Sequence, residues 1–181
     1  GYDNNLFIGG IDHENWNMLN NSIDRPLNNR ALRGVYPPGS TFKPFMALAA
    51  LELGKRTPEY SMADPGLFSL PGVKHRFRDW KPGGHGRVNL HKSLVVSCDT
   101  FYYSLGNDLG IDNMHNFIGQ FGLGKKTGID VENEVSGLLP SSAWKMAQHK
   151  QKWYAGDTIS AAIGQGYNLT TPLQLAFATM M

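Results

Sequence analysis

A proline- and glycine-rich stretch that runs straight into an apolar segment constrains this chain more than any other feature. Residues 36–44 (YPPGSTFKP) interrupt any preceding element, because proline lacks a backbone N–H and keeps the residue before it out of the helical conformation. Good helix formers follow as far as Leu53, and Gly54 ends the run. The pattern predicts a buried helix over residues 41–53, with Ser40 at its N-terminus.

Ser40 and Lys43 are three residues apart in this stretch. Residues at that spacing lie on the same face of a helix, so we expect the Lys43 amine to reach the Ser40 hydroxyl. A serine becomes a good nucleophile when a base lies beside it, and a neutral lysine can be that base. The helix N-terminus adds backbone N–H groups that suit a developing oxyanion. Taken alone, however, the pattern fits a capping serine beside a solvated lysine better.

Length and composition exclude several classes of protein. The 181 residues suffice for one domain with a sizeable core, and 41% apolar and 18% charged residues are ordinary for a globular chain. The net charge is +2 and the basic residues are scattered along the sequence, so nucleic-acid binding has no support. The single cysteine, Cys98, excludes an intrachain disulfide. No run approaches the roughly 18 apolar residues of a membrane span. The chain lacks an initiator methionine, and we expect an internal piece of a longer protein.

Hydrophobic spacing predicts mostly helices along the rest of the chain. Two short runs, 67–70 and 75–77, are joined by Pro71-Gly72 and predict a β-hairpin, which the glycine-rich loop 80–86 follows. Further helices are expected over residues 13–19, 89–97, 100–109, 112–121, 143–150 and 159–163, and a capping box at Thr171 opens a last one. We expect Leu94 and Val95 to face inward and Asp112 to cap its helix. The fold class is therefore mostly α with one small hairpin.

Ser97-Cys98-Asp99 falls between two of these helices and should form a tight loop that projects two polar side chains. Alone, it could simply place Asp99 as the N-cap of the following helix. Cys98 is interpreted as a small buried residue and not as a nucleophile, because no histidine is positioned to pair with it. The loop follows Ser40 by 57 residues, and the order S-x-x-K, S-x-N, K-[ST]-G is characteristic of penicillin-binding proteins and β-lactamases.

The chain resembles the class B penicillin-binding proteins, which are monofunctional transpeptidases, and within them the branch of the rod-elongation machinery. The motifs that carry the resemblance cover nearly the whole chain in the right order: 2–7 (YDNNLF), 24–31 (DRPLNNRA), 36–44, 80–86 (WKPGGHG), 97–103 (SCDTFYY), 153–157 (WYAGD) and 163–167 (IGQGY). Asp99 stands where most members of the wider superfamily have Asn, and this departure itself resembles the rod-elongation branch.

The resemblance implies an α/β parent fold with a central antiparallel sheet and a helical subdomain. Residues 1–181 would be a partial transpeptidase domain whose central strands are largely missing. Its parts would be an entry loop region (1–35), the nucleophile helix (36–54), the hairpin and glycine-rich loop (55–88) and the helical subdomain (89–181). Apolar side chains of the nucleophile helix, such as Phe42, Phe45 and Leu48, should then be exposed or rearranged.

The chemistry that the resemblance implies is that of a peptidoglycan D,D-transpeptidase. Ser40 would attack the penultimate D-Ala carbonyl of a stem pentapeptide, or a β-lactam that imitates it, with Lys43 as general base. Ser97 would relay a proton toward the leaving amine, and Asp99 would hold Ser97 and Lys43 in place. The substrate-binding positions would be Gly39, Trp80 and His85, although Trp80 also fits as a packing residue and His85 as a loop anchor.

Lys126-Thr127-Gly128 matches the third motif, but we interpret it as a decoy. It comes only 27 residues after Asp99, in a glycine-framed loop, whereas the functional motif must lie on an edge strand beside the site. By resemblance, the true K-[ST]-G strand would lie beyond Met181. The piece alone is therefore expected to be catalytically poor.

No cofactor is implied, and the six histidines have neither zinc-ligand spacing nor a cysteine pair, so no metal site is expected. Expected partners are stem pentapeptides, β-lactam antibiotics, and a glycan polymerase with other membrane proteins of the elongation complex. The expected location is the bacterial inner membrane, with the catalytic domain facing the periplasm and the anchor outside this chain. Two alternatives stay open. One is a β-lactamase or β-lactam sensor of the same fold, and the other is a non-catalytic scaffold module of the elongation complex.

Overall fold

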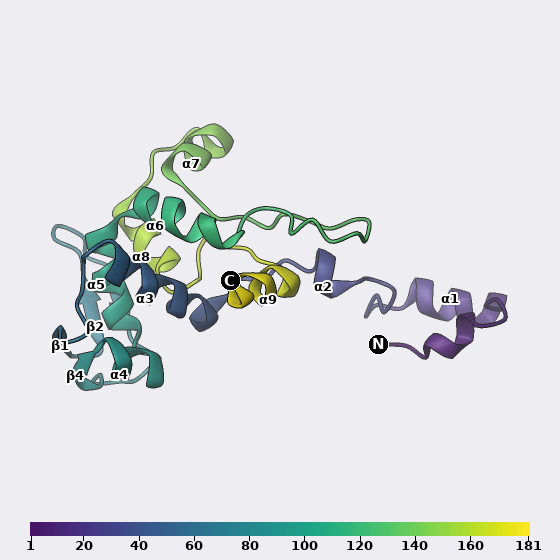
Figure 1. Ribbon diagram of the computed structural model, residues 1–181, viewed down its shortest axis with the longest axis horizontal. Helices are drawn as coiled ribbons and strands as arrows, with labels where there is room; N and C mark the ends of the chain where they lie inside the picture. Colours follow the sequence, from purple (N-terminus) through teal and green to yellow (C-terminus); the bar gives the residue numbers. More distant parts are fainter.

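The computed structural model describes all residues from 1 to 181 (Figure 1). Helices dominate, as the sequence predicts, and the strands form only two small sheets. In chain order the elements are η1 (Asn4–Phe7), α1 (His13–Asn21), α2 (Arg30–Arg33), η2 (Gly39–Phe42), α3 (Lys43–Glu52), β1 (Ser61–Asp64), β2 (Leu67–Ser69), β3 (Arg76–Arg78), β4 (Gly86–Asn89), α4 (Leu90–Val95), α5 (Asp99–Leu109), α6 (Ile111–Ile118), η3 (Gly119–Phe121), α7 (Ser142–His149), α8 (Ala155–Ala161) and α9 (Pro172–Met180). No helix combines the length and the hydrophobicity that a bilayer crossing requires.

An N-terminal arm carries η1 and α1 away from the rest of the molecule (Figure 1). Asp12 starts α1 by accepting a hydrogen bond from the backbone N–H of Asn15 at 2.9 Å, so the helix predicted over residues 13–19 is confirmed. The short helix α2 joins this arm to the body. Its Leu32 is buried, and the Leu32 carbonyl accepts from the N–H of Val135 at 3.1 Å. The body therefore holds the arm through α2.

The core of the body is built around α5. Phe101, Tyr102 and Leu105 are fully buried on it, and the helix packs against α3, α6, α8 and the strands β1, β2 and β3. Gly106 lies in the middle of α5, where a glycine weakens a helix by about 1 kcal/mol. A Cβ at this position would lie 2.4 Å from the Cβ of Ala162, so the missing side chain lets α8 approach closely.

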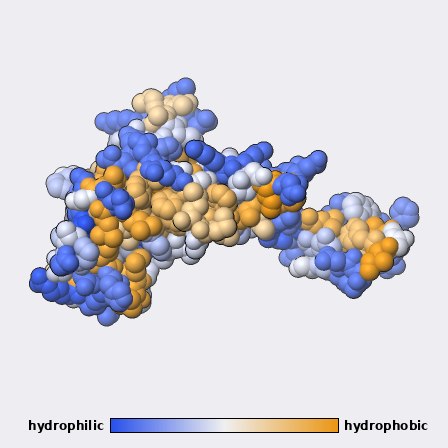
Figure 2. All heavy atoms as spheres, viewed as in Figure 1, coloured by the Kyte–Doolittle hydropathy of each residue, from blue (hydrophilic) through white to orange (hydrophobic).

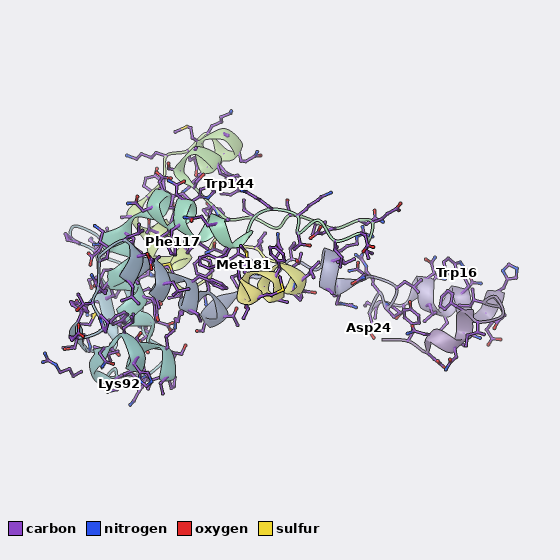
Figure 3. All side chains as sticks on the ribbon, in the orientation of Figure 1. Trp16, Asp24, Lys92, Phe117, Trp144 and Met181 are labelled. Carbon is purple, nitrogen blue, oxygen red and sulfur yellow. The ribbon has the colours of Figure 1, made fainter.

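Both small sheets are antiparallel pairs. The predicted hairpin is confirmed: β2 pairs with β3, with Leu67 opposite Arg78 and Ser69 opposite Arg76. The sequence did not indicate the second pair, in which β1 lies beside β4 with Asp64 opposite Gly86. Lys92, which is labelled in Figure 3, lies on α4. Its Nζ donates hydrogen bonds to the carbonyls of His85, just before β4, and Arg87, within β4, at 2.9 Å each. This lysine thus ties α4 to the second sheet.

The expected exposure of the nucleophile helix is only partly correct. Phe42 and Phe45 are buried, with Phe45 against Phe121 at a ring-centroid distance of 5.2 Å, because the helical part of the chain covers them. Leu48 and Leu51, on the other side of α3, are exposed. Figure 2 shows hydrophobic atoms gathered over the middle of the body in this view.

Several predicted helix ends differ from the observed ones. Leu94 and Val95 were expected to face inward but are exposed, because α4 ends at Val95 and turns directly into the loop before α5. Asp112 does not cap α6, since the helix already begins at Ile111. Its carboxylate instead accepts from the Ser142 N–H and hydroxyl and so ties α7 to α6. The capping box at Thr171 is confirmed.

Candidate active site

The turn before α3 is anchored by segments far away in the sequence. Tyr36 forms an isolated antiparallel bridge with Thr170, with two backbone hydrogen bonds of 2.9 Å. The Gly39 N–H donates to the carbonyl of Gly164 at 2.9 Å, and Gly39 has a φ of +56°, which glycine adopts without strain. The position of Ser40, the next residue, is therefore fixed by the chain around residue 164.

Lys43 lies fully inside the molecule although it carries a charge. It begins α3, is 1% exposed, and its Nζ has three acceptors: Ser97 O at 2.8 Å, Ser97 Oγ at 3.0 Å and Asp99 Oδ1 at 2.6 Å. Three acceptors match the three N–H bonds of an ammonium group. The face of the Tyr102 ring, 5.5 Å away, adds a favourable cation–π contact. These contacts are those of a charged lysine at rest.

The Ser40 and Lys43 side chains are linked through Ser97 and not directly. The Ser97 hydroxyl donates to Ser40 Oγ at 2.7 Å, and Lys43 donates to the same Ser97 oxygen. The direct contact that helical spacing predicted does not form, because the acceptors on the 97–99 loop draw the lysine side chain toward them. A continuous path Ser40 Oγ–Ser97 Oγ–Lys43 Nζ results.

Ser97 occupies a backbone conformation that few residues other than glycine adopt. Its φ is +51°, in the left-handed region, and such outliers cluster at functional sites. This conformation directs both the carbonyl and the hydroxyl of Ser97 toward Lys43. The loop is closed by the Cys98 N–H, which donates to Ser93 O at 2.9 Å. The tight loop predicted between the two helices is thus present.

Asp99 is the first residue of α5, and Cys98 takes the N-cap position. A carboxylate in the first turn is stabilised by the positive end of the helix dipole. The Asp99 side chain is 15% exposed and forms an ion pair with Lys43. Asp99 therefore holds Lys43 in place and does not act as the N-cap of α5, which was the alternative.

A hollow of about 350 Å³ opens in front of Ser40. It is lined by Ser40, Trp80, Ser97, Asp99, Ile163 and Gln165. Trp80 was also considered as a packing residue, yet it is 62% exposed at the rim, where its Nε1 donates to Val96 O at 3.1 Å. Five of the predicted site residues thus come together: Ser40, Lys43, Ser97, Asp99 and Trp80.

The other two predicted substrate-binding residues are placed differently. The Gly39 N–H is already used by Gly164 and so cannot bind a ligand. The His85 side chain is 4% exposed and lies behind Trp80, with a ring-centroid distance of 5.3 Å. The His85 ring packs against the Trp80 ring and does not line the hollow.

Sequence reasoning missed Ile163 and Gln165 as lining residues. Gln165 is exposed, and its side chain forms no hydrogen bond within the chain, so its carboxamide is available to a ligand. Gly164 and Gly166 frame it with φ values of +70° and +65°. This glycine pair was a signal for a sharp turn, and the sequence made residues 164–166 a candidate for lying near the site, but it assigned them no role.

Lys126-Thr127-Gly128 lies in the long loop between η3 and α7 (Figure 1). The Thr127 N–H and hydroxyl and the Gly128 N–H all donate to the Glu134 carboxylate, at 2.6, 2.7 and 3.2 Å. Burial raises the pKa of Glu134, but these hydrogen bonds outweigh it and hold the pKa below its ordinary value. None of the three residues lines the hollow at Ser40, and the motif serves a local turn here.

Four potential metal ligands converge behind the site. One donor atom each of Asp64, Asp79, His85 and Cys98 lies within 4.8 Å of the others. His85 Nδ1 is 2.8 Å from Asp64 Oδ2 and 3.6 Å from Asp79 Oδ1, and Cys98 Sγ is 3.3 Å from the same Asp64 oxygen. Burial raises the pKa of Asp64, but hydrogen bonds from Gly66 and His85 outweigh it, and the pKa is about 2. Burial also raises the pKa of the Cys98 thiol.

This set of donors suits a transition metal. One sulfur, one imidazole nitrogen and two carboxylate oxygens are the ligand types that Zn²⁺ accepts in tetrahedral sites. A divalent ion would neutralise two buried carboxylates. The hydrogen bonding of the cluster is also incomplete, because His85 Nε2 is buried without a partner. The four residues could therefore hold zinc. The expectation of no metal site considered only histidine spacing and cysteine pairs, and could not anticipate a mixed set.

A serine at the start of a helix, a buried lysine and a second serine on an interhelical loop come together in an arrangement that suits serine acyl transfer. Residues 2–181 match the family described as the penicillin binding protein transpeptidase domain, and the chain belongs to this family. The chain is 52% identical, over 98% of its length, to the peptidoglycan D,D-transpeptidase MrdA of Acinetobacter baumannii. The resemblance to class B penicillin-binding proteins is thus confirmed.

Solved structures agree with this assignment. The Pseudomonas aeruginosa PBP2 structure in complex with WCK 5153 matches 99% of this chain with a TM-score of 0.93 and 47% identity, and 41% of that chain is covered. The Helicobacter pylori PBP2–MreC complex matches 96% with a TM-score of 0.88 and 40% identity, covering 32% of that chain. The chain spans about a quarter of the curated relatives it matches, with 26% of the A. baumannii protein covered.

Proposed function

We propose that this chain forms the nucleophile-bearing part of a peptidoglycan D,D-transpeptidase that cross-links stem peptides during cell-wall elongation. The observation that carries the proposal is the path from Ser40 Oγ through Ser97 Oγ to the buried Lys43 Nζ, which ends on Asp99. A buried lysine held by Ser97 and Asp99 has no structural purpose that an apolar side chain would not serve better.

Lys43, which is charged at rest, first loses one proton to solvent, and in the acylation step it acts as the free amine. The Ser97 hydroxyl, which at rest donates to Ser40, turns to donate to the free amine, and Ser40 then donates to Ser97. The Ser40 oxygen forms a bond to the carbonyl carbon of the penultimate D-Ala, while its proton passes through the Ser97 hydroxyl to Lys43. The C–N bond to the terminal D-Ala then breaks, and the leaving amine takes up that proton along the same path. An amine of a second stem peptide attacks the ester, forms the cross-link and returns a proton to Ser40.

The resting geometry supports these roles. Asp99 and the Ser97 carbonyl keep Lys43 in position, so the side chain has little freedom to lose during reaction. Ser40 lies in the first turn of η2, where backbone N–H groups have no partner within the helix and can stabilise an oxyanion. Trp80 and Gln165 both line the hollow and offer an aromatic surface and a carboxamide to a peptide.

β-Lactams, which imitate the D-Ala-D-Ala amide, are proposed to acylate Ser40 and stay attached. The P. aeruginosa relative was solved in complex with WCK 5153, which supports a ligand-binding site in this fold. The H. pylori relative was solved together with MreC. Membrane proteins of an elongation complex and a glycan polymerase are therefore proposed as partners, at the inner membrane with this domain in the periplasm.

Intact-mass spectrometry after incubation with a penicillin tests the proposal, using the full-length protein and its Ser40→Ala variant. We expect one adduct that maps to Ser40, persists for many minutes and is absent from the variant. An adduct that forms and clears quickly would indicate a β-lactamase. A folded protein that forms no adduct would indicate a scaffold module, whose binding to partners Ser40→Ala would leave intact.

A comparison of chain lengths tests the role of the third motif. We propose that residues 1–181 alone acylate slowly, because the resemblance implies that the functional K-[ST]-G strand and a second oxyanion N–H belong to another part of the parent protein. Acylation of the 181-residue chain at the rate of the full-length protein would refute this. Replacing Lys126 by alanine should leave acylation unchanged in either chain, because Lys126 lies in the loop that Glu134 organises.

A further inference from the structure

The β2–β3 hairpin and the loop after it concentrate positive charge that the net charge of the chain conceals. Between residues 67 and 87 every exposed charged side chain is a cation, and the one acid, Asp79, is buried. These cations are Lys74, Arg76, Arg78, Lys81 and Arg87. None of them takes part in an ion pair. The whole chain carries only +2, so the excess is local.

The pairing of the two strands places the arginines on one face. Phe68 and Phe77 are opposite each other and both pack against Tyr103, with ring-centroid distances of 6.2 and 5.7 Å. Because side chains alternate along a strand, Arg76 and Arg78 lie on the other, outward face. They line an open hollow of about 640 Å³ together with Leu67, Lys74 and His75. We call Lys74, Arg76 and Arg78 the basic ribbon.

The basic ribbon leads directly to the rim of the Ser40 hollow. Arg78 is followed by Asp79, and then by Trp80, which lines that hollow. The end of the ribbon is also tied to α5: the Tyr103 hydroxyl donates to Arg78 O at 3.1 Å, and the Thr100 N–H donates to Asp79 Oδ2 at 3.0 Å. The cationic face therefore has a fixed position relative to the helix that carries Asp99.

We propose that the basic ribbon binds the free carboxylates of peptidoglycan stem peptides and guides a wall strand toward Ser40. The proposal rests on the proposed function, because it takes its ligand from that reaction. Stem peptides carry several carboxylates at short intervals, and alternate positions on a strand are about 6 to 7 Å apart, which suits successive contacts. Arginine binds carboxylates through two parallel hydrogen bonds, and the exposed Leu67 adds apolar contact for the peptide.

The test compares two triple variants of the full-length protein. Lys74→Gln/Arg76→Gln/Arg78→Gln removes the basic ribbon, and Lys125→Gln/Lys126→Gln/Lys150→Gln removes three exposed cations elsewhere. Binding is measured with disaccharide–pentapeptide fragments of the wall, with the same fragments after their carboxylates are amidated, and with anionic phosphatidylglycerol vesicles. Penicillin acylation of Ser40, a small-ligand reaction, reports whether each variant is folded.

We expect the ribbon variant to bind the unmodified fragments roughly tenfold more weakly, as three exposed charge pairs of modest strength imply, while the control variant binds like wild type. Binding by wild type should weaken with added salt and with amidation. Equal binding by both variants, or equal binding of amidated fragments, would overturn the proposal, as would loss of vesicle binding alone. If wild type itself does not acylate Ser40 with penicillin, the proposed function is refuted, while binding of the fragments to the basic ribbon can still be measured.

Discussion

Replacing Gly164 by alanine tests whether the turn around residue 164 sets the position of the nucleophile. A Cβ at Gly164 would lie 2.3 Å from the Gly39 carbonyl oxygen and 2.8 Å from the Gly39 nitrogen. Side-chain carbons essentially never approach closer than 3.0 Å, so the oxygen must move from 2.3 to at least 3.0 Å, a shift of about 0.7 Å. The atom that must move belongs to the residue before Ser40.

The magnitude follows from two separate effects. Alanine in the left-handed conformation costs about 1 kcal/mol, because Gly164 has a φ of +70°. A displacement approaching 1 Å at a reacting group lowers a rate by roughly 100-fold. Gly128→Ala is the matched control, since Gly128 has a φ of +82° but no heavy atom within 4 Å of the added Cβ. The control shares the backbone cost without the displacement.

Both variants are compared with wild type by thermal unfolding and by the second-order rate of penicillin acylation. We expect both to lose stability, Gly164→Ala more so, and only Gly164→Ala to acylate roughly 100-fold more slowly. A folded Gly164→Ala protein that acylates at the wild-type rate would show that Ser40 does not depend on this turn. Equal losses of rate in both variants would mean that strained backbone, and not displacement of Gly39, is responsible.

Three further predictions concern charges inside the fold. Asp99→Ala leaves Lys43 buried without its partner and should lower the free energy of unfolding by about 2–4 kcal/mol in denaturant titrations. This loss is somewhat smaller than for a fully enclosed pair, because the Asp99 side chain is 15% exposed. Asp99→Asn keeps an acceptor for Lys43 and should lose less stability. Glu134→Gln should lower the unfolding temperature at pH 7. The difference from wild type should shrink as the pH falls below the ordinary pKa of a glutamate, because a carboxylate with a lowered pKa stabilises the fold above its ordinary pKa and loses that contribution as it is protonated. Stoichiometric zinc should raise the unfolding temperature of wild type but not of Cys98→Ser. An equal change of unfolding temperature in both proteins would show that hydrogen bonds alone hold the cluster of Asp64, Asp79, His85 and Cys98 together.

Local patterns in the sequence were sufficient for the parts of the site that one segment builds. The start of α3, the loop at Ser97 and the β2–β3 hairpin each follow from capping residues, glycine and proline positions, and hydrophobic period. The connection of Ser40 to Lys43 did not follow, because spacing along a helix says which side chains can meet but not which acceptors a long lysine will choose. That choice depends on Ser97 and Asp99, more than 50 residues away.

Features assembled from several segments were beyond local reasoning. The β1–β4 pair joins residues 61–64 to 86–89, and the four possible zinc ligands come from two loops and a strand end. Gln165 is exposed and follows no period, so local patterns assigned it no role, although the turn 164–166 was a candidate for lying near the site. In each case the missing information is tertiary, and no window of sequence contains it.

The bridge between Tyr36 and Thr170 has a consequence for how the active site comes into being. Its two residues are 134 positions apart, and contacts of such long range form late because a large loop must close first. During synthesis the turn at Ser40 emerges well before its anchors at residues 164–170. We therefore expect the nucleophile to remain unpositioned in the growing chain, and the polypeptide to become reactive only once its C-terminal part has docked.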